Sequence, residues 1–325
     1  AITGPAIGHP GSASFGTVDL VGLDVLGHVI NTLKDGCPND EQRALFDIPD
    51  FMKSMIEGGS LGRKTKDKGG FFKIVKGDDG SKTKMVIDWK TGEYRPKDKV
   101  RYPSLGAAKK NHNVADRLRD LVNSDDRAGA FAWRLTRDTL IYASKRFGEI
   151  SDSIVDIDNA LKWGYNWELG PFESWDAIGV KASVDRMAAE GFEPAQWVLD
   201  MLAAGHESFY IESSEGRQYY DPQSGEYLQE PKPDSFMVLK DITRDDTKVV
   251  FSNKGASVID IGDGVLCVQF HSAVQPKLNP VDDDIMEGLE KGLEIGQRDF
   301  RGMVVHHQGE NFSAGANLLM VLEGI

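Results

Sequence analysis

The stretch that decides the fold is Ile154–Val180, IVDIDNALKWGYNWELGPFESWDAIGV, which combines helical apolar spacing with a sharp turn. Ile154, Ile157 and Leu161 recur at spacings of three and four residues. That spacing places them on one face of a helix. Gly164 is expected to end this helix. The stretch therefore predicts a helix, a turn and a second helix.

The second helix is predicted to begin at Gly170-Pro171. Proline at a first helical position loses no useful hydrogen-bond donor, and Glu173 would lie near the positive end of the helix dipole. Gly179 is expected near its end. The buried side would carry Phe172, Trp175 and Ile178. The aromatic side chains are interpreted as core packing where two helices meet, with a ligand-stacking surface as the alternative; they are Trp163, Trp167, Phe172 and Trp175.

The same pattern occurs earlier in the chain, at a constant offset of 157 residues. A second similarity follows each copy, because residues 88–94 (DWKTGEY) match residues 221–227 (DPQSGEY) as Gly-containing strand turns. Two related patterns in the same order predict a duplicated unit of roughly 100 residues. In the first of these patterns the identical residues are Phe15 and Phe172, Asp19 and Asp176, and Gly22 and Gly179.

Composition narrows the class of protein. The chain has 325 residues, of which 40% are hydrophobic and 27% charged, as in globular proteins. Its net charge of −13 argues against nucleic acid or an anionic membrane as main partner. Cys37 and Cys267 lie in different predicted domains, so we expect a reducing compartment, either the cytoplasm or an organelle matrix. No apolar run predicts a membrane span, and no cluster predicts a metal site.

The remaining elements are predicted from periodicity and turn residues. Residues 230–234 (EPKPD) read as a linker. After the linker, strand, helix, strand and turn predict the opening of an α/β domain. The expected helices are 17–32, 48–58, 107–122, 130–145, 194–203 and 280–296, and the expected strands are 71–74, 85–88, those within 209–227 and 258–270, and 302–307.

Two groups of polar residues have alternative interpretations. The basic loop in residues 61–74 can hold a phosphate or simply be solvated, and solvation is the commoner case; its cations are Arg63, Lys64, Lys66 and Lys68. The histidines are interpreted as structural, because nothing supplies a further metal ligand or an orienting acid; they are His9, His28, His306 and His307.

Residues 1–74 and 126–203 resemble the C-terminal domain of 3-hydroxyacyl-CoA dehydrogenases, in tandem as in multifunctional fatty-acid oxidation proteins. The resemblance implies a mainly α fold, the 6-phosphogluconate dehydrogenase C-terminal-like helical domain. The first copy would lack its N-terminal helix. The residues that carry the resemblance are Ile157-Asp158-Asn159-Ala160, Gly170-Pro171-Phe172-Glu173, Asp176 and Gly179, with Leu61-Gly62-Arg63-Lys64-Thr65 and Gly70-Phe71-Phe72 in the first copy.

Residues 258–325 resemble the beginning of an enoyl-CoA hydratase (crotonase) domain, an incomplete α/β segment. The resemblance rests on Gly264-Val265, the loop 276–279 (PKLN) and residues 312–317 (FSAGAN). It implies that the backbone N–H of Ala316 is one oxyanion donor to the thioester carbonyl. It also implies a CoA site in which one loop receives the adenine; the site residues are Pro276, Lys277, Leu278, Ala314, Gly315 and Ala316.

These resemblances imply four segments: residues 1–115, 116–235, a linker 236–257, and 258–325. The parent enzyme would oxidise 3-hydroxyacyl-CoA with NAD and hydrate 2-enoyl-CoA, with acyl-CoA as substrate and a thiolase subunit as possible partner. The fragment itself would be inactive, because the dinucleotide site and the hydratase carboxylates would lie outside it. The alternative is a non-catalytic acyl-CoA-binding or dimer-like assembly module.

Overall fold

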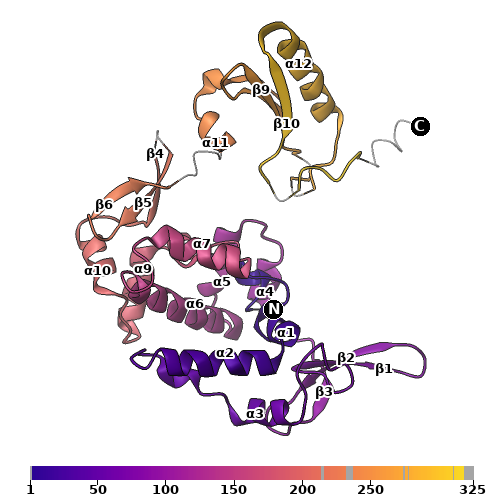
Figure 1. Ribbon diagram of the computed structural model, residues 1–325, viewed down its shortest axis with the longest axis vertical. Helices are drawn as coiled ribbons and strands as arrows, with labels where there is room; N and C mark the ends of the chain where they lie inside the picture. The colour runs from indigo at the N-terminus through magenta and orange to yellow at the C-terminus, as the bar shows by residue number, and fades with distance from the viewer. Residues whose placement is uncertain are drawn as a thin grey trace. The chain divides into compact units, whose positions relative to one another are not determined.

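The computed structural model describes residues 2–213, 216–231, 237–273, 275–276, 278–309 and 311–317 (Figure 1). These residues form two compact units. Unit 1 comprises Ala1–Ile211 and Tyr219–Leu228, and unit 2 comprises Glu212–Gln218 and Gln229–Ile325. Each unit has a hydrophobic core of its own.

The first half of unit 1 carries short helices followed by a small antiparallel sheet of order β1-β2-β3. One long helix was expected over residues 17–32, and this prediction is wrong: the helix is broken at Gly22, whose φ of +112° lies outside the range of L side chains. The elements are η1 (Pro5–Ile7), α1 (Ala13–Val21), α2 (Leu23–Gly36), η2 (Arg43–Phe46), α3 (Asp50–Glu57), β1 (Phe72–Lys76), β2 (Lys82–Ile87) and β3 (Tyr94–Pro96).

The second half of unit 1 begins with two short helices where the sequence predicted one over residues 107–122. A longer helical region then leads to a second three-stranded sheet, of order β4-β5-β6. The elements are α4 (Pro103–Ala108), α5 (Val114–Val122), α6 (Arg127–Arg146), α7 (Ile154–Tyr165), α8 (Pro171–Ile178), α9 (Val180–Ala189), α10 (Gln196–Ala203), β4 (Tyr210–Ser213), β5 (Gly216–Asp221) and β6 (Glu226–Gln229).

Local capping explains the boundaries of α7 and α8. Helix α7 continues through Gly164 to Tyr165, and it ends because Asn166 adopts the left-handed conformation. Helix α8 begins at Pro171, as predicted, and the Glu173 carboxylate accepts a hydrogen bond from the N–H of Gly170 at 2.9 Å. That contact satisfies a donor at the first turn of the helix.

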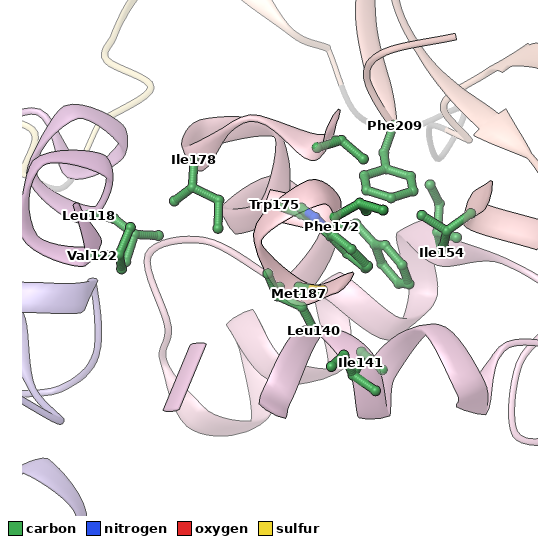
Figure 2. Close-up of a cluster of buried hydrophobic side chains, with 14 of the residues drawn as sticks. Leu118, Val122, Leu140, Ile141, Ile154, Phe172, Trp175, Ile178, Met187 and Phe209 are labelled. Atoms are coloured by element: carbon green, nitrogen blue, oxygen red, sulfur yellow. The ribbon is translucent and has the colours of Figure 1, made fainter. Parts of the chain in front are cut away.

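The core of unit 1 lies around α8 (Figure 2). Phe172 and Trp175 are fully buried, and Phe209 packs edge-on against Phe172 at 5.1 Å between ring centroids. Trp163, in contrast, is 80% exposed, so its expected role in the core is wrong. The core face of α6 carries Ala132, Trp133, Leu140 and Ile141.

The two halves of unit 1 repeat the same local structure. We call α1–α3 with β1–β3 repeat 1, and α8–α10 with β4–β6 repeat 2. In each repeat one aspartate of the first helix accepts hydrogen bonds from two successive backbone N–H groups at the start of the sheet. Asp19 receives those of Phe71 and Phe72 at 2.7 and 2.8 Å. Asp176 receives those of Phe209 and Tyr210, both at 2.8 Å.

Three further pairs of features match between the repeats. Both first helices end at a glycine with positive φ, +112° at Gly22 and +89° at Gly179. Both place a phenylalanine edge-on against the aromatic ring at the start of the sheet, Phe15 on Phe71 and Phe172 on Phe209. In both sheets the third strand carries a tyrosine whose hydroxyl donates to a backbone carbonyl; these pairs are Tyr94 to Gly70 and Tyr227 to Ser208.

The loops that precede the two first helices contact each other. The imidazole of His9 stacks on the indole of Trp167, with ring centroids 3.8 Å apart and an interplanar angle of 16°. The N–H of Glu168 donates to the carbonyl of Gly8 at 2.7 Å. Positions 9 and 167 are almost equivalent in the repeat, so each loop packs against its counterpart, as at an interface related by two-fold symmetry.

A polar contact joins α6 to the segment that follows α2. The Asp40 carboxylate, whose side chain is 3% exposed, accepts a hydrogen bond from the Tyr142 hydroxyl at 2.6 Å. Arg146 pairs with Asp40 at 3.2 Å and with Glu41 at 2.8 Å. Burial, followed by the hydrogen bond to Asp40, raises the pKa of Tyr142 to about 12. The hydroxyl therefore remains a donor at neutral pH.

Unit 2 is a four-stranded sheet of order β10-β9-β8-β7 with α12 packed against it. The β8–β9 hairpin, α12 and β10 match the predicted elements, and β10 pairs with β9 in parallel. On α12, Leu293 is 51% exposed, and on β10, Val304 and Val305 are 44% and 37% exposed. The elements are α11 (Leu239–Ile242), η3 (Asp246–Lys248), β7 (Val249–Ser252), β8 (Ala256–Asp260), β9 (Val265–Phe270), α12 (Asp283–Asp299) and β10 (Gly302–His306).

The expected mainly α fold holds only in part. Helices form most of unit 1, but the described residues also contain three sheets, and unit 2 mixes strands with helices.

Replacement of Tyr142 by Phe should lower the free energy of unfolding by about 1 kcal/mol, because the Asp40 carboxylate loses a donor in a site that water does not reach freely. Urea unfolding monitored by circular dichroism measures the change. Tyr165→Phe is the matched control, since Tyr165 is 65% exposed. Equal stability of the two variants would show that the Asp40 contact contributes nothing.

Candidate functional site

Two loops that the sequence assigned to one site lie side by side in unit 2. The N–H of Ala314 donates to the carbonyl of Leu278 at 2.7 Å. The N–H of Val281 donates to the carbonyl of Gly315 at 2.8 Å, and the N–H of Asn317 donates to the carbonyl of Val281 at 3.0 Å. Val281 and Ala316 form a parallel bridge. The loop that follows β9 is thus joined to the loop that follows β10.

This bridge determines the direction of the Ala316 amide. Val281 bonds to the residues before and after Ala316, so the N–H and C=O of Ala316 point to the other side of the strand. Ala316 is exposed, and within the described residues its N–H donates to no backbone acceptor. Gly315 supplies the turn in front of it with a φ of +88°. The bridge thus fixes the direction of this backbone donor.

Asn279 holds the two loops together. The sequence had not placed it among the predicted site residues. Its side chain is fully buried: the carboxamide oxygen accepts from the N–H of Ser272 at 2.8 Å, and the Nδ2 group donates to the carbonyl of Phe312 at 2.9 Å. Its φ of +49° is in the left-handed region, which Asn tolerates better than most residues. An asparagine after a Pro-Lys-Leu loop is the signal that could have identified it.

The other predicted CoA-binding residues are only partly brought together. Leu278 is 50% exposed beside the bridge, and Phe312 is 51% exposed, with its ring 5.5 Å from that of Phe270. Pro276 lies two residues before Leu278 in the same loop. Lys277 lies outside the described residues. Leu278 and Phe312 are thus exposed apolar side chains of the two joined loops.

Unit 1 contains a buried carboxyl group with an unusual pKa. Asp158 of α7 is fully buried, and its oxygens accept from the N–H groups of Phe172 and Glu173 and from the Tyr210 hydroxyl. Burial, with a further contribution from the charge of Glu173, raises the pKa of Asp158 to about 7, although the three hydrogen bonds oppose the shift. Asp158 connects α7 to the first turn of α8, which is a structural role.

The contacts of the basic loop of repeat 1 and of His9 are local ones. Lys64 pairs with Asp24 at 2.6 Å, and burial against the stacked Trp167 lowers the pKa of His9 to about 4. The described residues contain no group of three or more His, Cys, Asp or Glu side chains placed to hold a metal ion. In the same part of the chain, no single helix is long and apolar enough to cross a membrane, although α1 and α2, bent by 99°, pass that test as a pair.

The sequence of this chain is similar to those of known proteins. Residues 2–72 match the family model described as 3-hydroxyacyl-CoA dehydrogenase, C-terminal domain. The chain is 41% identical over 322 residues to a Bacillus subtilis (strain 168) protein named "Probable 3-hydroxyacyl-CoA dehydrogenase". That alignment covers 99% of this chain and 39% of the relative.

Two further relatives extend the comparison. A Rickettsia prowazekii (strain Madrid E) protein named "Putative fatty acid oxidation complex trifunctional enzyme" is 26% identical over 98% of this chain and 39% of its own length. A Deinococcus radiodurans protein named "Probable 3-hydroxyacyl-CoA dehydrogenase" is 41% identical over 75 residues, 23% of this chain and 20% of the relative. The chain thus spans 39% of the length of the first two relatives.

Residues 2–72 are thus similar to the C-terminal domain of 3-hydroxyacyl-CoA dehydrogenases. The similarity to the Bacillus subtilis protein extends along 99% of this chain. The likeness of repeat 2 to repeat 1 rests on the equivalent aspartates, glycines and aromatic pairs.

The raised pKa of Asp158 predicts a pH dependence of stability. The folded state holds the proton up to about pH 7, whereas the unfolded chain releases it near pH 4, so the contribution of Asp158 is fully present below about pH 4 and is lost as the pH rises through 7. Asp158→Asn lacks this titration. The free energy of unfolding of the wild type, minus that of the variant, should therefore fall by at least about 1 kcal/mol between pH 5 and pH 8.5.

Urea unfolding of both proteins at a series of pH values provides the measurement. Asp156→Asn, on the exposed side of the same helix, is the control and should track the wild type. A difference between wild type and Asp158→Asn that stays constant with pH would contradict a raised pKa at this site.

Proposed function

We propose that this chain is part of a fatty-acid β-oxidation enzyme that oxidises 3-hydroxyacyl-CoA with NAD and hydrates 2-enoyl-CoA. The similarity to proteins named 3-hydroxyacyl-CoA dehydrogenase and fatty acid oxidation complex trifunctional enzyme supports the pathway. Acyl-CoA thioesters are its substrates, a thiolase subunit is its partner, and the bacterial cytoplasm is its compartment. The chain alone performs neither reaction.

The hydratase part of the proposal rests on one observation, the fixed direction of the Ala316 backbone N–H. Hydration of an enoyl thioester develops negative charge on the carbonyl oxygen, and a pre-oriented backbone N–H stabilises that charge without reorganisation. The parallel bridge to Val281 fixes this amide in direction and leaves it without a backbone acceptor in the described part of the chain. The loop at Leu278 lies beside it and would receive the CoA moiety. The carboxylates that act on water are assigned to the remaining part of the enzyme.

The dehydrogenase part of the proposal gives unit 1 a supporting role. The described residues offer no glycine-rich strand-to-helix turn for a dinucleotide, so we assign no step of hydride transfer to them. The two repeats would instead serve as a rigid support for the remaining part of the enzyme. NAD, which dehydrogenases of this family generally use, would bind to the remaining part of the enzyme.

A second candidate function, a non-catalytic dimer-like assembly module, is favoured by one observation. The stack of His9 on Trp167 and the hydrogen bond from Glu168 to Gly8 make the two repeats meet as two subunits of a dimer would. Under this alternative, unit 1 organises an assembly, and the loops of unit 2 take no part in chemistry.

Ala316→Pro separates the two candidates, because proline lacks the backbone N–H. In an enzyme that carries this chain together with the remaining hydratase segments, the substitution should lower kcat for crotonyl-CoA hydration by a factor of about 10² to 10³. Ala316→Ser keeps the N–H and should stay within tenfold of the wild type. Equal activity of the two variants would exclude the amide from catalysis and favour the assembly module.

The 325-residue chain alone is the baseline for this experiment. Its rates with crotonyl-CoA, and with NADH and acetoacetyl-CoA, should equal those of the blank without protein. Turnover above the blank in either assay would show that this chain is sufficient for catalysis, against the proposal.

A further inference from the structure

Asn279 lies where the two loops of unit 2 meet. These loops follow β9 and β10, which pair in parallel and therefore end at the same edge of the sheet (Figure 1). Asn279 is completely buried, and its backbone φ is +49°. A buried carboxamide is costly unless its donors and its acceptor are paired. The hydrogen bonds of this one side chain therefore constrain both loops.

Asn279 first closes the loop to which it belongs. Its backbone N–H donates to the carbonyl of Gln275 at 2.8 Å, and its carboxamide oxygen accepts from the N–H of Ser272 at 2.8 Å. Ser272 is also buried, with 1% of its surface exposed. One residue thus holds both ends of the segment 272–279. Pro276 and Leu278, two of the residues predicted to contact CoA, belong to this segment.

The same side chain also contacts the second loop. The Nδ2 group of Asn279 donates to the carbonyl of Phe312 at 2.9 Å, four residues before Ala316. Backbone contacts on either side of Asn279 continue the connection. The carbonyl of Leu278 accepts an N–H of the second loop at 2.7 Å, and Val281 forms the bridge to Ala316. A displacement of the first loop is therefore transmitted to the Ala316 amide.

We propose that Asn279 is a positioning residue that couples the binding of CoA to the orientation of the Ala316 amide. This inference rests on the hydratase part of the proposed function. Asn279 is buried, so it acts through the two loops and not on the substrate itself. When the CoA moiety binds beside Leu278, it fixes the first loop, and the contacts of Asn279 then hold the Ala316 N–H toward the thioester carbonyl oxygen. Binding energy from a remote part of the substrate is thereby used at the reacting carbonyl.

Asn279→Gly removes the side chain without straining the backbone, because glycine adopts a positive φ freely. Asn166→Gly is the matched control: Asn166 has the same left-handed backbone, with a φ of +53°, but it is exposed and follows α7 in unit 1. Both variants are made in an enzyme that carries this chain together with the remaining hydratase segments. Circular dichroism and thermal unfolding check that they fold.

The test compares crotonyl-CoA with crotonyl-pantetheine, which lacks the nucleotide half of CoA. In the wild type the nucleotide half should raise kcat as well as lower KM, because its binding orients the Ala316 amide. Asn279→Gly should lower kcat for crotonyl-CoA about 10- to 100-fold, to within about threefold of its kcat for crotonyl-pantetheine. KM for crotonyl-CoA should change less than kcat. Asn166→Gly should keep both kcat values of the wild type.

Asn279→Asp provides a conservative variant whose activity depends on pH. Aspartate tolerates the left-handed backbone as asparagine does. Its neutral carboxyl can accept from the N–H of Ser272 and donate to the carbonyl of Phe312, whereas its charged form has no proton to donate. Hydration of crotonyl-CoA, relative to the wild type at the same pH, should therefore increase as the pH falls from about 8 to about 5.5. Asn279→Gly should not show this increase.

The 325-residue chain alone gives a readout that does not depend on hydratase activity. Relaxation of the 15N nucleus of the Ala316 amide reports its motion as an order parameter. Asn279→Gly should lower the order parameter of Ala316, and Asn166→Gly should leave it at the wild-type value. An unchanged order parameter in Asn279→Gly would contradict the positioning role.

The kinetic outcomes separate this inference from the proposed function. If Ala316→Pro leaves hydration unchanged, the proposed function fails and the inference fails with it. If Ala316→Pro lowers kcat while Asn279→Gly keeps the wild-type ratio of the two kcat values, the coupling is wrong and the proposed function stands. Asn279→Gly should have no further effect on kcat in the Ala316→Pro background, and an undiminished effect there would also overturn the inference. If Asn279→Gly does not fold, the pH profile of Asn279→Asp decides, and a flat profile overturns the inference.

Discussion

The structure of unit 1 depends on a carboxylate that accepts hydrogen bonds from two successive backbone N–H groups. In each repeat this aspartate lies on the first helix, and its two acceptor oxygens fix the start of the small sheet. Burial raises the pKa of Asp19, although both N–H groups oppose the shift. The two backbone N–H groups therefore replace the water that a buried carboxylate would otherwise need. In both repeats each oxygen of the carboxylate accepts from one of the two N–H groups.

This constraint explains why the two repeats look alike despite few shared residues. The first helix must end abruptly so that the aspartate faces the sheet, and a glycine with positive φ follows the helix in both repeats. The aromatic residue that the aspartate holds then packs on the helix. Because both repeats keep this geometry, their preceding loops can meet face to face at His9 and Trp167. Unit 1 thus has the contacts of a rigid support.

Several features could be predicted from the sequence because local chemistry determines them. The start of α8 follows from Gly170 and Pro171, and the equivalence of Asp19 and Asp176 follows from a constant offset. Other features depend on tertiary contacts that periodicity does not encode. Trp163 has the spacing of a core residue but lies on a side of α7 that no described element buries, and the core face of α6 is chosen by its partners α5 and α8. In unit 2 the two loops of the site could be predicted from the sequence. The role of Asn279 could not, because it depends on a left-handed backbone conformation and on two hydrogen bonds to other parts of unit 2.

The most direct test of the aspartate clamps is residue-resolved hydrogen exchange of four amides, those of Phe71, Phe72, Phe209 and Tyr210, in wild type and in two variants. Asp19→Ala should strongly accelerate exchange at Phe71 and Phe72 and leave the other pair protected, because each clamp serves its own repeat. Asp176→Ala should do the converse. Protection that persists at both pairs after removal of the carboxylates would show that other contacts hold the sheets, and it would contradict the central role of the two aspartates.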